Sequence, residues 1–169
     1  MTQEQADKYY IKVAQLCAKN SYALKLQVGA IIVKDGQIMS DGFNGTPCGF
    51  ENKCEILECT TNYCKYNKIL ANDFKFCVNC VYSKLSTKSY VLHAESNAIL
   101  KCAKYGRPTN GSTLYITHSP CIECAKLIIQ AGIIRVVYLE DYKNSDGINL
   151  LKKVDIKVEK LDLWSIVKY

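Results

Sequence analysis

The sequence predicts a single α/β domain with a mixed β-sheet, and three observations lead to this prediction. From His93 onward, segments with helical periodicity alternate with β-branched, strand-like runs. Such alternation is typical of parallel strands whose faces are covered by helices. The first half contains a two-strand hairpin pattern instead, which adds antiparallel pairing. The 169 residues, 49% hydrophobic and 22% charged, fit one globular domain over residues 1–169 with a core of its own.

The expected elements follow one another along the chain. Thr2 and Gln5 form a capping-box pattern ahead of an amphipathic helix over residues 3–20. A β-branched run over 26–33, a turn at Asp35-Gly36 and a second run over 37–43 predict the hairpin. The second half then predicts, in order, a helix over 94–106, a strand over 112–118, a helix over 121–132, a strand over 133–140, a helix over 145–153 and a strand over 155–161.

Between the two halves lies a cysteine-rich insertion, residues 48–90, which shows no sustained periodicity and holds six of the ten cysteines. A connection this long is unusual unless it is functional or organised by something other than an apolar core. In a reducing compartment, dense cysteine favours metal binding over disulfides. We therefore expect a structural zinc, with unligated thiols as the alternative. The expected ligands are Cys54, Cys59, Cys77 and Cys80, with Cys64 as the first substitute.

Composition also bears on location and partners. No apolar run approaches the ~18 residues that cross a bilayer, and the N-terminal stretch lacks the pattern of a signal peptide. We therefore expect a cytoplasmic protein without a membrane partner. The formal net charge is +6, but the lysines are scattered along the chain. This distribution favours a small phosphorylated substrate over nucleic acid as the partner.

Two short motifs stand at the expected starts of neighbouring helices. His93 and Glu95 open the first helix, and Cys121 and Cys124, directly after Pro120, open the second. Zinc prefers tetrahedral nitrogen and sulfur ligands, and a catalytic site uses three protein ligands and leaves the fourth position to water. Helix N-termini stabilise thiolates. The pattern therefore predicts a catalytic zinc site with His93, Cys121 and Cys124 as ligands, and with Glu95 as the group that moves protons.

Each half of this pattern has a simpler interpretation when it is taken alone. A Cys-x-x-Cys pair can be a redox dithiol, a histidine before a helix is usually a polar cap, and Glu95 can be a first-turn carboxylate. Together, however, H-x-E and P-C-x-x-C are the known signature of the zinc-dependent nucleobase deaminases. In that chemistry zinc lowers the pKa of water from ~15.7 to ~7. The combination therefore favours the catalytic interpretation.

On three stretches, the sequence resembles the dCMP deaminase family of the cytidine deaminase-like superfamily. They are VGAIIVKDGQIMSDGFNGTP, VLHAESNAILKCAKYG and GSTLYITHSPCIECAKLIIQAGIIRVVYLE. The resemblance implies a three-layer αβα sandwich around a five-stranded mixed sheet, and zinc-dependent hydrolysis of dCMP to dUMP and ammonia in pyrimidine deoxynucleotide metabolism. The implied or suggested substrate contacts are Asn44 for the sugar, the Ala94 amide for the base, His118 and Ser119 for the pocket wall, and Tyr142, Lys25 and Lys143 for the phosphate.

Some expectations stay open at this point. Tyr142, Lys25 and Lys143 are proposed from position and donor type alone, and for each lysine an ordinary surface charge is the alternative. The resemblance implies a homo-oligomer, often a hexamer, and in some members dCTP activation and dTTP inhibition with Mg²⁺. Competing functions are deamination of cytidine, of a modified cytosine nucleotide or of a pterin. A zinc-stapled binding module without catalysis is a further alternative, but such a module would not need Glu95.

Overall fold

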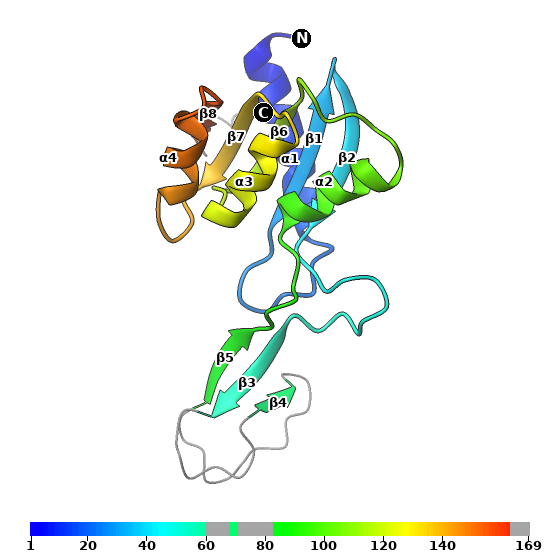
Figure 1. Cartoon of the computed structure of the whole chain (residues 1–169), viewed down its shortest axis with the longest axis vertical. Coiled ribbons are helices and arrows are strands. Elements are labelled where there is room, and N and C mark those ends of the chain that lie inside the picture. The colour runs from blue at the N-terminus through cyan, green and yellow to red at the C-terminus, as the bar shows by residue number, and fades with distance from the viewer. Residues whose placement is uncertain (60–67, 71–82, 163–169) are drawn as a thin grey trace.

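The computed structural model describes residues 1–59, 68–70 and 83–162, and its main body is built on one five-stranded sheet (Figure 1). The strand order is β2-β1-β6-β7-β8. β1 pairs antiparallel with both β2 and β6, whereas the β6–β7 and β7–β8 pairs are parallel. The mixed sheet predicted from the sequence is therefore confirmed. The strands are β1 (Gly29–Lys34), β2 (Gln37–Phe43), β6 (Thr113–His118), β7 (Arg135–Glu140) and β8 (Lys157–Lys160).

Helices cover both faces of this sheet and give the expected three-layer αβα sandwich (Figure 1). α1 (Gln3–Ala18) lies on one face, over a core cluster that includes Tyr10 and Ile11. On the other face lie α2 (Ala94–Lys104), α3 (Ile122–Gln130) and α4 (Asp146–Lys152), over a second and larger cluster. The two crossovers between parallel strands each contain one helix, α3 or α4, as is usual for parallel pairs.

The central strands are apolar on both sides because both faces of the sheet are covered. In β1, Ala30 and Ile32 join the core beneath α2 to α4, while Ile31 and Val33 join the core beneath α1. β6 and β7 alternate in the same way. Strands buried on both faces read as continuous apolar runs, which explains why these segments were recognised as strands without a polar–apolar alternation.

Element boundaries follow the local signals closely. The capping box is formed, with the Gln5 amide donating to Thr2 Oγ1 at 3.3 Å and the Thr2 amide donating to Gln5 Oε1 at 2.9 Å. α2 and α3 end just before Gly106 and Gly132, whose φ values of 64° and 71° are those of C-terminal glycine stops. The first strand begins at Gly29 rather than at residue 26, because residues 24–28 form a loop held by side chains described below.

The insertion contains regular structure that the sequence analysis did not predict. Its described part holds β3 (Glu55–Cys59), β4 (Lys68–Leu70) and β5 (Ser83–Thr87), which form an antiparallel sheet in the order β4-β3-β5. Figure 1 shows this small sheet below the main body. These strands were missed because small antiparallel sheets draw on cross-strand pairing, which leaves little periodic pattern in any one segment.

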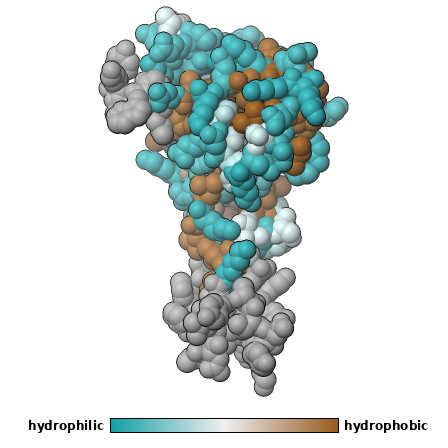
Figure 2. Space-filling view, turned by 90° about the vertical axis from the view of Figure 1, so that its left-hand side faces the viewer, coloured by the Kyte–Doolittle hydropathy of each residue, from teal (hydrophilic) through white to brown (hydrophobic). Residues whose placement is uncertain are grey.

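The face of the molecule drawn in Figure 2 is mainly hydrophilic. On the face drawn in Figure 2, hydrophilic side chains surround smaller apolar patches. No helix within the described ranges has the length and apolar character required to cross a lipid bilayer.

Candidate active site and metal centre

The three expected zinc ligands come together at the N-termini of α2 and α3. His93 is the N-cap residue of α2, Cys121 is the N-cap residue of α3, and Cys124 lies in the first turn of α3. Both N-cap residues have extended backbones, and within the described part of the chain neither side chain caps its own helix. The polar-cap interpretation of His93 is therefore not supported, because the imidazole points towards the two sulfur atoms.

The spacing of the donor atoms fits zinc. His93 Nδ1 lies 3.5 Å from Cys121 Sγ and 3.3 Å from Cys124 Sγ, and all three atoms lie within 4.8 Å of one another. A tetrahedral zinc with Zn–N of ~2.05 Å and Zn–S of ~2.3 Å needs an N···S separation of ~3.6 Å. The side chains thus already stand near ligand distance. Among the described residues, this is the one group of three such side chains close enough to hold a metal.

The two thiols are tightly coupled. The hydrogen bond from Cys124, with a smaller contribution from His93, lowers the pKa of Cys121 to about 3. The same contact with Cys121, together with burial, raises the pKa of Cys124 far above its ordinary value. The pair therefore holds one negative charge easily and a second only when a cation compensates it. Zinc binding at this site is expected to release the second proton.

Ser96 supports this pair and was not identified from the sequence. Its Oγ lies 3.7 Å from Cys124 Sγ, within hydrogen-bond range for sulfur, and the hydroxyl can donate to a thiolate. Ser96 stands three residues after His93, so both lie on the same face of the helix start. That spacing is the signal that could have identified it.

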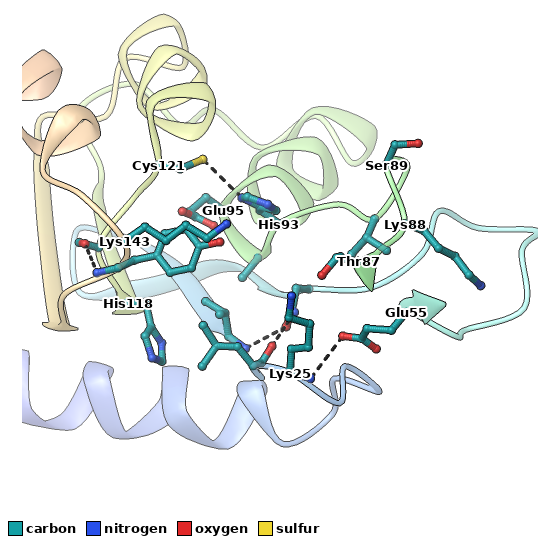
Figure 3. Close-up of a pocket in the computed structure, with 17 residues that line it drawn as sticks. Lys25, Glu55, Thr87, Lys88, Ser89, His93, Glu95, His118, Cys121 and Lys143 are labelled. Carbon is teal, nitrogen blue, oxygen red and sulfur yellow. Dashed lines mark hydrogen bonds between the residues drawn. The ribbon is translucent and has the colours of Figure 1, made fainter. Parts of the chain in front are cut away.

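Glu95 is a buried carboxyl beside the donor atoms. It lies in the first turn of α2, its exposed fraction is 3%, and Figure 3 shows it next to His93 and Cys121. Burial raises the pKa of Glu95 to about 7. A carboxyl with such a pKa can both accept and release a proton near neutral pH, which is what a proton shuttle requires.

These groups lie at one side of a cavity of about 530 Å³, a size common for small-molecule sites. All seven residues expected to contact substrate line it. It is also lined by five residues of the insertion and the segment after it, which the sequence analysis did not assign to the site. The lining residues are Lys25, Leu26, Val28, Asn44, Glu55, Thr87, Lys88, Ser89, Val91, His93, Ala94, Glu95, His118, Ser119, Cys121, Tyr142 and Lys143.

Asn44 has a structural task besides its expected contact with the sugar. Its Oδ1 accepts from the Val28 amide at 2.8 Å, and its Nδ2 donates to the Leu26 carbonyl at 2.9 Å. The side chain thereby holds the loop that forms one wall of the cavity. One N–H and one lone pair remain for a ligand, so the sugar contact stays a prediction.

The turn after β7 brings Tyr142 and Lys143 to the cavity. The buried Ser119 accepts a hydrogen bond from the Tyr142 amide at 2.8 Å and donates its own amide to the Glu140 carbonyl at 2.8 Å. Lys143 Nζ lies 5.1 Å from the Tyr142 ring centre. The turn is therefore held by Ser119, two residues before the expected zinc ligand Cys121.

His118 already has two polar neighbours. Its Nε2 lies 3.4 Å from Glu140 Oε2 and its Nδ1 lies 3.1 Å from Thr117 Oγ1. Its place in the cavity wall agrees with the expectation, while its contact with substrate remains a prediction.

Two glycines set how closely the ligand-bearing helices approach their neighbours, and no local signal marked them. A Cβ on Gly147 would lie 2.0 Å from the Pro120 carbonyl oxygen and 2.8 Å from the Cys121 carbonyl carbon. A Cβ on Gly42 would lie 2.2 Å from the Ala94 carbonyl oxygen. Each glycine thus allows direct backbone packing against a helix start that carries the site.

The ligand set expected for the structural zinc stays a prediction. Cys77, Cys80 and the substitute Cys64 lie outside the described residues. Cys54 precedes β3 and Cys59 ends it, so the extended chain separates the two α-carbons by ~16 Å.

Comparison with known proteins agrees with this geometry. The family model described as the cytidine and deoxycytidylate deaminase zinc-binding region matches residues 4–140. Deoxycytidylate deaminase of Enterobacteria phage T4 is 34% identical over an alignment 170 positions long, which covers 88% of this chain and 86% of the relative. ComE operon protein 2 of Bacillus subtilis is 35% identical over 162 residues, 95% of this chain and 74% of the relative.

A solved structure extends the likeness to the whole fold. The dCMP deaminase of cyanophage S-TIM5, in complex with dCMP and dUMP, is 36% identical and superposes with a TM-score of 0.74, covering 95% of this chain and 100% of the other. The family match spans most of the chain, including both ligand-bearing helix starts. The chain therefore belongs to the cytidine and deoxycytidylate deaminase family with its zinc-binding region.

Proposed function

We propose that this chain hydrolyses dCMP to dUMP and ammonia, as a zinc-dependent enzyme of pyrimidine deoxynucleotide metabolism. The observation that carries the proposal is the set of His93, Cys121 and Cys124 with the buried Glu95 beside it, at one side of a cavity. The phage T4 relative bears the name deoxycytidylate deaminase, and the S-TIM5 relative was solved with dCMP and dUMP. These two names support dCMP as the substrate.

The chain's own residues account for proton movement in this reaction. When bound, zinc lowers the pKa of water so that a hydroxide nucleophile is available near neutral pH. The net change forms a C4–O bond and breaks the C4–N bond of the base. The water oxygen loses two protons, of which one ends on ring nitrogen N3 and the other on the departing amine. Glu95 accepts and delivers these protons, because its carboxyl is buried beside the ligand atoms and burial raises its pKa towards neutrality.

The remaining cavity residues bind and orient the nucleotide. The Ala94 backbone and Asn44 are assigned to the base and the sugar, and Lys25, Tyr142 and Lys143 to the phosphate. Each of these lines the cavity. A phosphate bound by lysine ammonium groups and a tyrosine hydroxyl receives charge-assisted hydrogen bonds, which are about twice as strong as neutral ones. A net charge of +6 also suits an anionic substrate.

A panel of cytosine compounds tests the proposal. Purified zinc-loaded protein is incubated with dCMP, CMP, cytidine, deoxycytidine or dCTP, and loss of the 4-amino chromophore is followed, with Glu95→Ala as the blank. Turnover that is greatest with dCMP supports the proposal. Preference for another compound moves the substrate assignment within the family. No turnover at all, with dCTP and Mg²⁺ also present, favours the binding-module alternative.

We also propose a structural zinc in the insertion. The proposed ligands are Cys54, Cys59, Cys77 and Cys80. Because β3 separates the α-carbons of Cys54 and Cys59, Cys64 is the first substitute for one of these two. Four thiolates are a common structural zinc set. Metal analysis of the purified chain should give about two zinc ions per chain, and Cys77→Ser should lower the value to about one. A wild-type value of one contradicts this second site.

We also propose an assembly and a mode of regulation for this chain, on the ground of its resemblance to the family. We expect a cytoplasmic homo-oligomer, with a hexamer as the leading size, that dCTP activates and dTTP inhibits in the presence of Mg²⁺. The exposed apolar residues Leu100 of α2 and Ile122 and Leu127 of α3 support contact between copies. Light scattering measures the size, and turnover with and without each nucleotide measures the regulation.

A further inference from the structure

Glu55 is a buried carboxylate that the deamination chemistry above does not use. It is the first residue of β3, its exposed fraction is 2%, and it lines the substrate cavity. Its Oε2 accepts from the Leu24 amide at 3.1 Å and its Oε1 from the Lys25 amide at 3.4 Å. Both carboxylate oxygens are thus engaged by the backbone of one turn, 31 and 30 residues earlier in the chain.

The base of the insertion forms part of the cavity wall around this contact. Glu55 and Thr87 are paired residues on the neighbouring strands β3 and β5, and both line the cavity. The Lys88 amide donates to the Cys54 carbonyl at 2.9 Å, which continues the pairing beyond the strand ends. Figure 3 shows Glu55 bonded to the backbone of Lys25, with Thr87 close by. The insertion therefore supports the turn that presents Lys25.

A carboxylate in a cavity for an anionic nucleotide needs an explanation, since its charge repels phosphate. The explanation is that both carboxylate oxygens of Glu55 accept hydrogen bonds from backbone N–H groups. A carboxylate offers two acceptors, one for each amide, whereas a glutamine side chain offers only one acceptor and presents an NH₂ group to the second amide. The buried contact thus requires a carboxylate, and its loss leaves an amide without an acceptor.

We propose that Glu55 is a positioning residue for the phosphate end of the cavity, holding the Leu24–Lys25 turn so that the Lys25 ammonium can pair with the 5′-phosphate of the substrate. The inference rests on the proposed role of Lys25 and goes beyond it. It makes the insertion a determinant of affinity for phosphorylated substrates, acting through the loop of the main body rather than through direct contact.

The charge effect and the positioning effect of Glu55 have opposite signs, which makes the proposal testable. If Glu55 acted only through its charge, Glu55→Gln would remove a repulsion and tighten phosphate binding. If it positions Lys25, the same change weakens phosphate binding although the local charge becomes more favourable. Glu51→Gln is the matched control, because Glu51 lies in the same insertion but is exposed and paired with Lys53.

Calorimetric dissociation constants for dUMP and deoxyuridine, which differ only in the phosphate, provide the readout for zinc-loaded wild type and each variant. We expect Glu55→Gln to weaken dUMP binding about tenfold, the effect of roughly one lost charge-assisted hydrogen bond, with deoxyuridine unchanged. Lys25→Ala should weaken dUMP at least as much, and Glu51→Gln should match wild type. In turnover, KM for dCMP should rise while kcat stays within about twofold.

Three results overturn the proposal: dUMP binding that is unchanged or tighter in Glu55→Gln, equal losses for dUMP and deoxyuridine, or Lys25→Ala without effect. Should Glu55→Gln not fold, Glu55→Asp keeps the charge but withdraws both oxygens by one methylene group. Glu55→Asp should then weaken the binding of dUMP, and an unchanged dissociation constant for dUMP contradicts the inference. Absence of dCMP turnover in the wild type contradicts the proposed reaction instead, so the two failures are distinguishable.

Discussion

Replacing Gly147 with alanine should damage the zinc site from outside the cavity. Gly147 lies in the first turn of α4, and its α-carbon packs directly on the backbone of Pro120 and Cys121. An added Cβ would stand 2.0 Å from the Pro120 oxygen, whereas real Cβ atoms essentially never approach a heavy atom closer than 3.0 Å. The two segments must therefore separate by about 1 Å, and both are backbone, so no flexible side chain can absorb the shift.

The expected magnitude follows from this overlap. Overpacking of this kind typically costs about 1–3 kcal/mol, while alanine in a helix gains about 0.5–1 kcal/mol over glycine. The net loss of stability is thus roughly 0–2.5 kcal/mol. The loss of zinc affinity should be larger than the loss of stability, because a metal-binding site tolerates displacements of only ~0.5 Å. Changes that disturb the support of metal ligands lower metal affinity by about 10–100-fold, and we expect a loss in that range.

Zinc affinity measured by competition with a chromophoric chelator tests this prediction, with thermal unfolding of the metal-free protein alongside. Gly29→Ala is the matched control, since its Cβ would also lie 2.0 Å from a carbonyl oxygen, that of Ala14 in α1. The control should lose similar stability but keep zinc affinity within about twofold. If Gly147→Ala binds zinc as tightly as wild type, the idea that α4 sets the position of Cys121 is refuted.

Three further changes probe the site and the fold. Glu95→Gln should keep its zinc but lower kcat by about 10²–10⁴-fold, and normal turnover with bound zinc would exclude Glu95 as the proton shuttle. Ser96→Ala removes the contact with Cys124 Sγ and should weaken zinc binding by about tenfold; a chelator titration that matches wild type would show that the hydroxyl gives no support. Burial raises the pKa of Asp7, but its hydrogen bonds, the largest contribution coming from Arg135, bring it below its ordinary 3.8. The stabilisation of the fold by the Asp7 carboxylate is therefore present above pH ~3.8 and is lost as the pH falls through the lower pKa of Asp7 in the folded state. Asp7→Asn should therefore lower the free energy of unfolding by about 3 kcal/mol at pH 7 and by much less in acid. A constant difference in unfolding free energy between pH 7 and pH 2.5 would contradict this.

Much of the fold and the grouping of the candidate site residues could be predicted because their signals are local. The capping box at Thr2, the glycine stop at Gly132 and the apolar runs of the strands each reflect the geometry of a few neighbouring residues. The same holds for the three expected zinc ligands. Cys121 and Cys124 are three residues apart and stand at a helix start, so local geometry sets their spacing, and His93 occupies the equivalent position on the neighbouring helix.

Contacts between distant segments were decided only by the tertiary structure. No pattern around Glu55 indicates that its oxygens bind the amides of Leu24 and Lys25, because that contact exists only once the base of the insertion meets the loop before β1. Cys54 and Cys59 are close in the sequence, and only the structure shows that strand β3 separates their α-carbons. In the sequence, Gly147 is only a residue of low helix propensity, whereas the structure shows that it packs against the backbone of Pro120. Local periodicity determines which elements form, whereas the path of the chain determines which side chains meet.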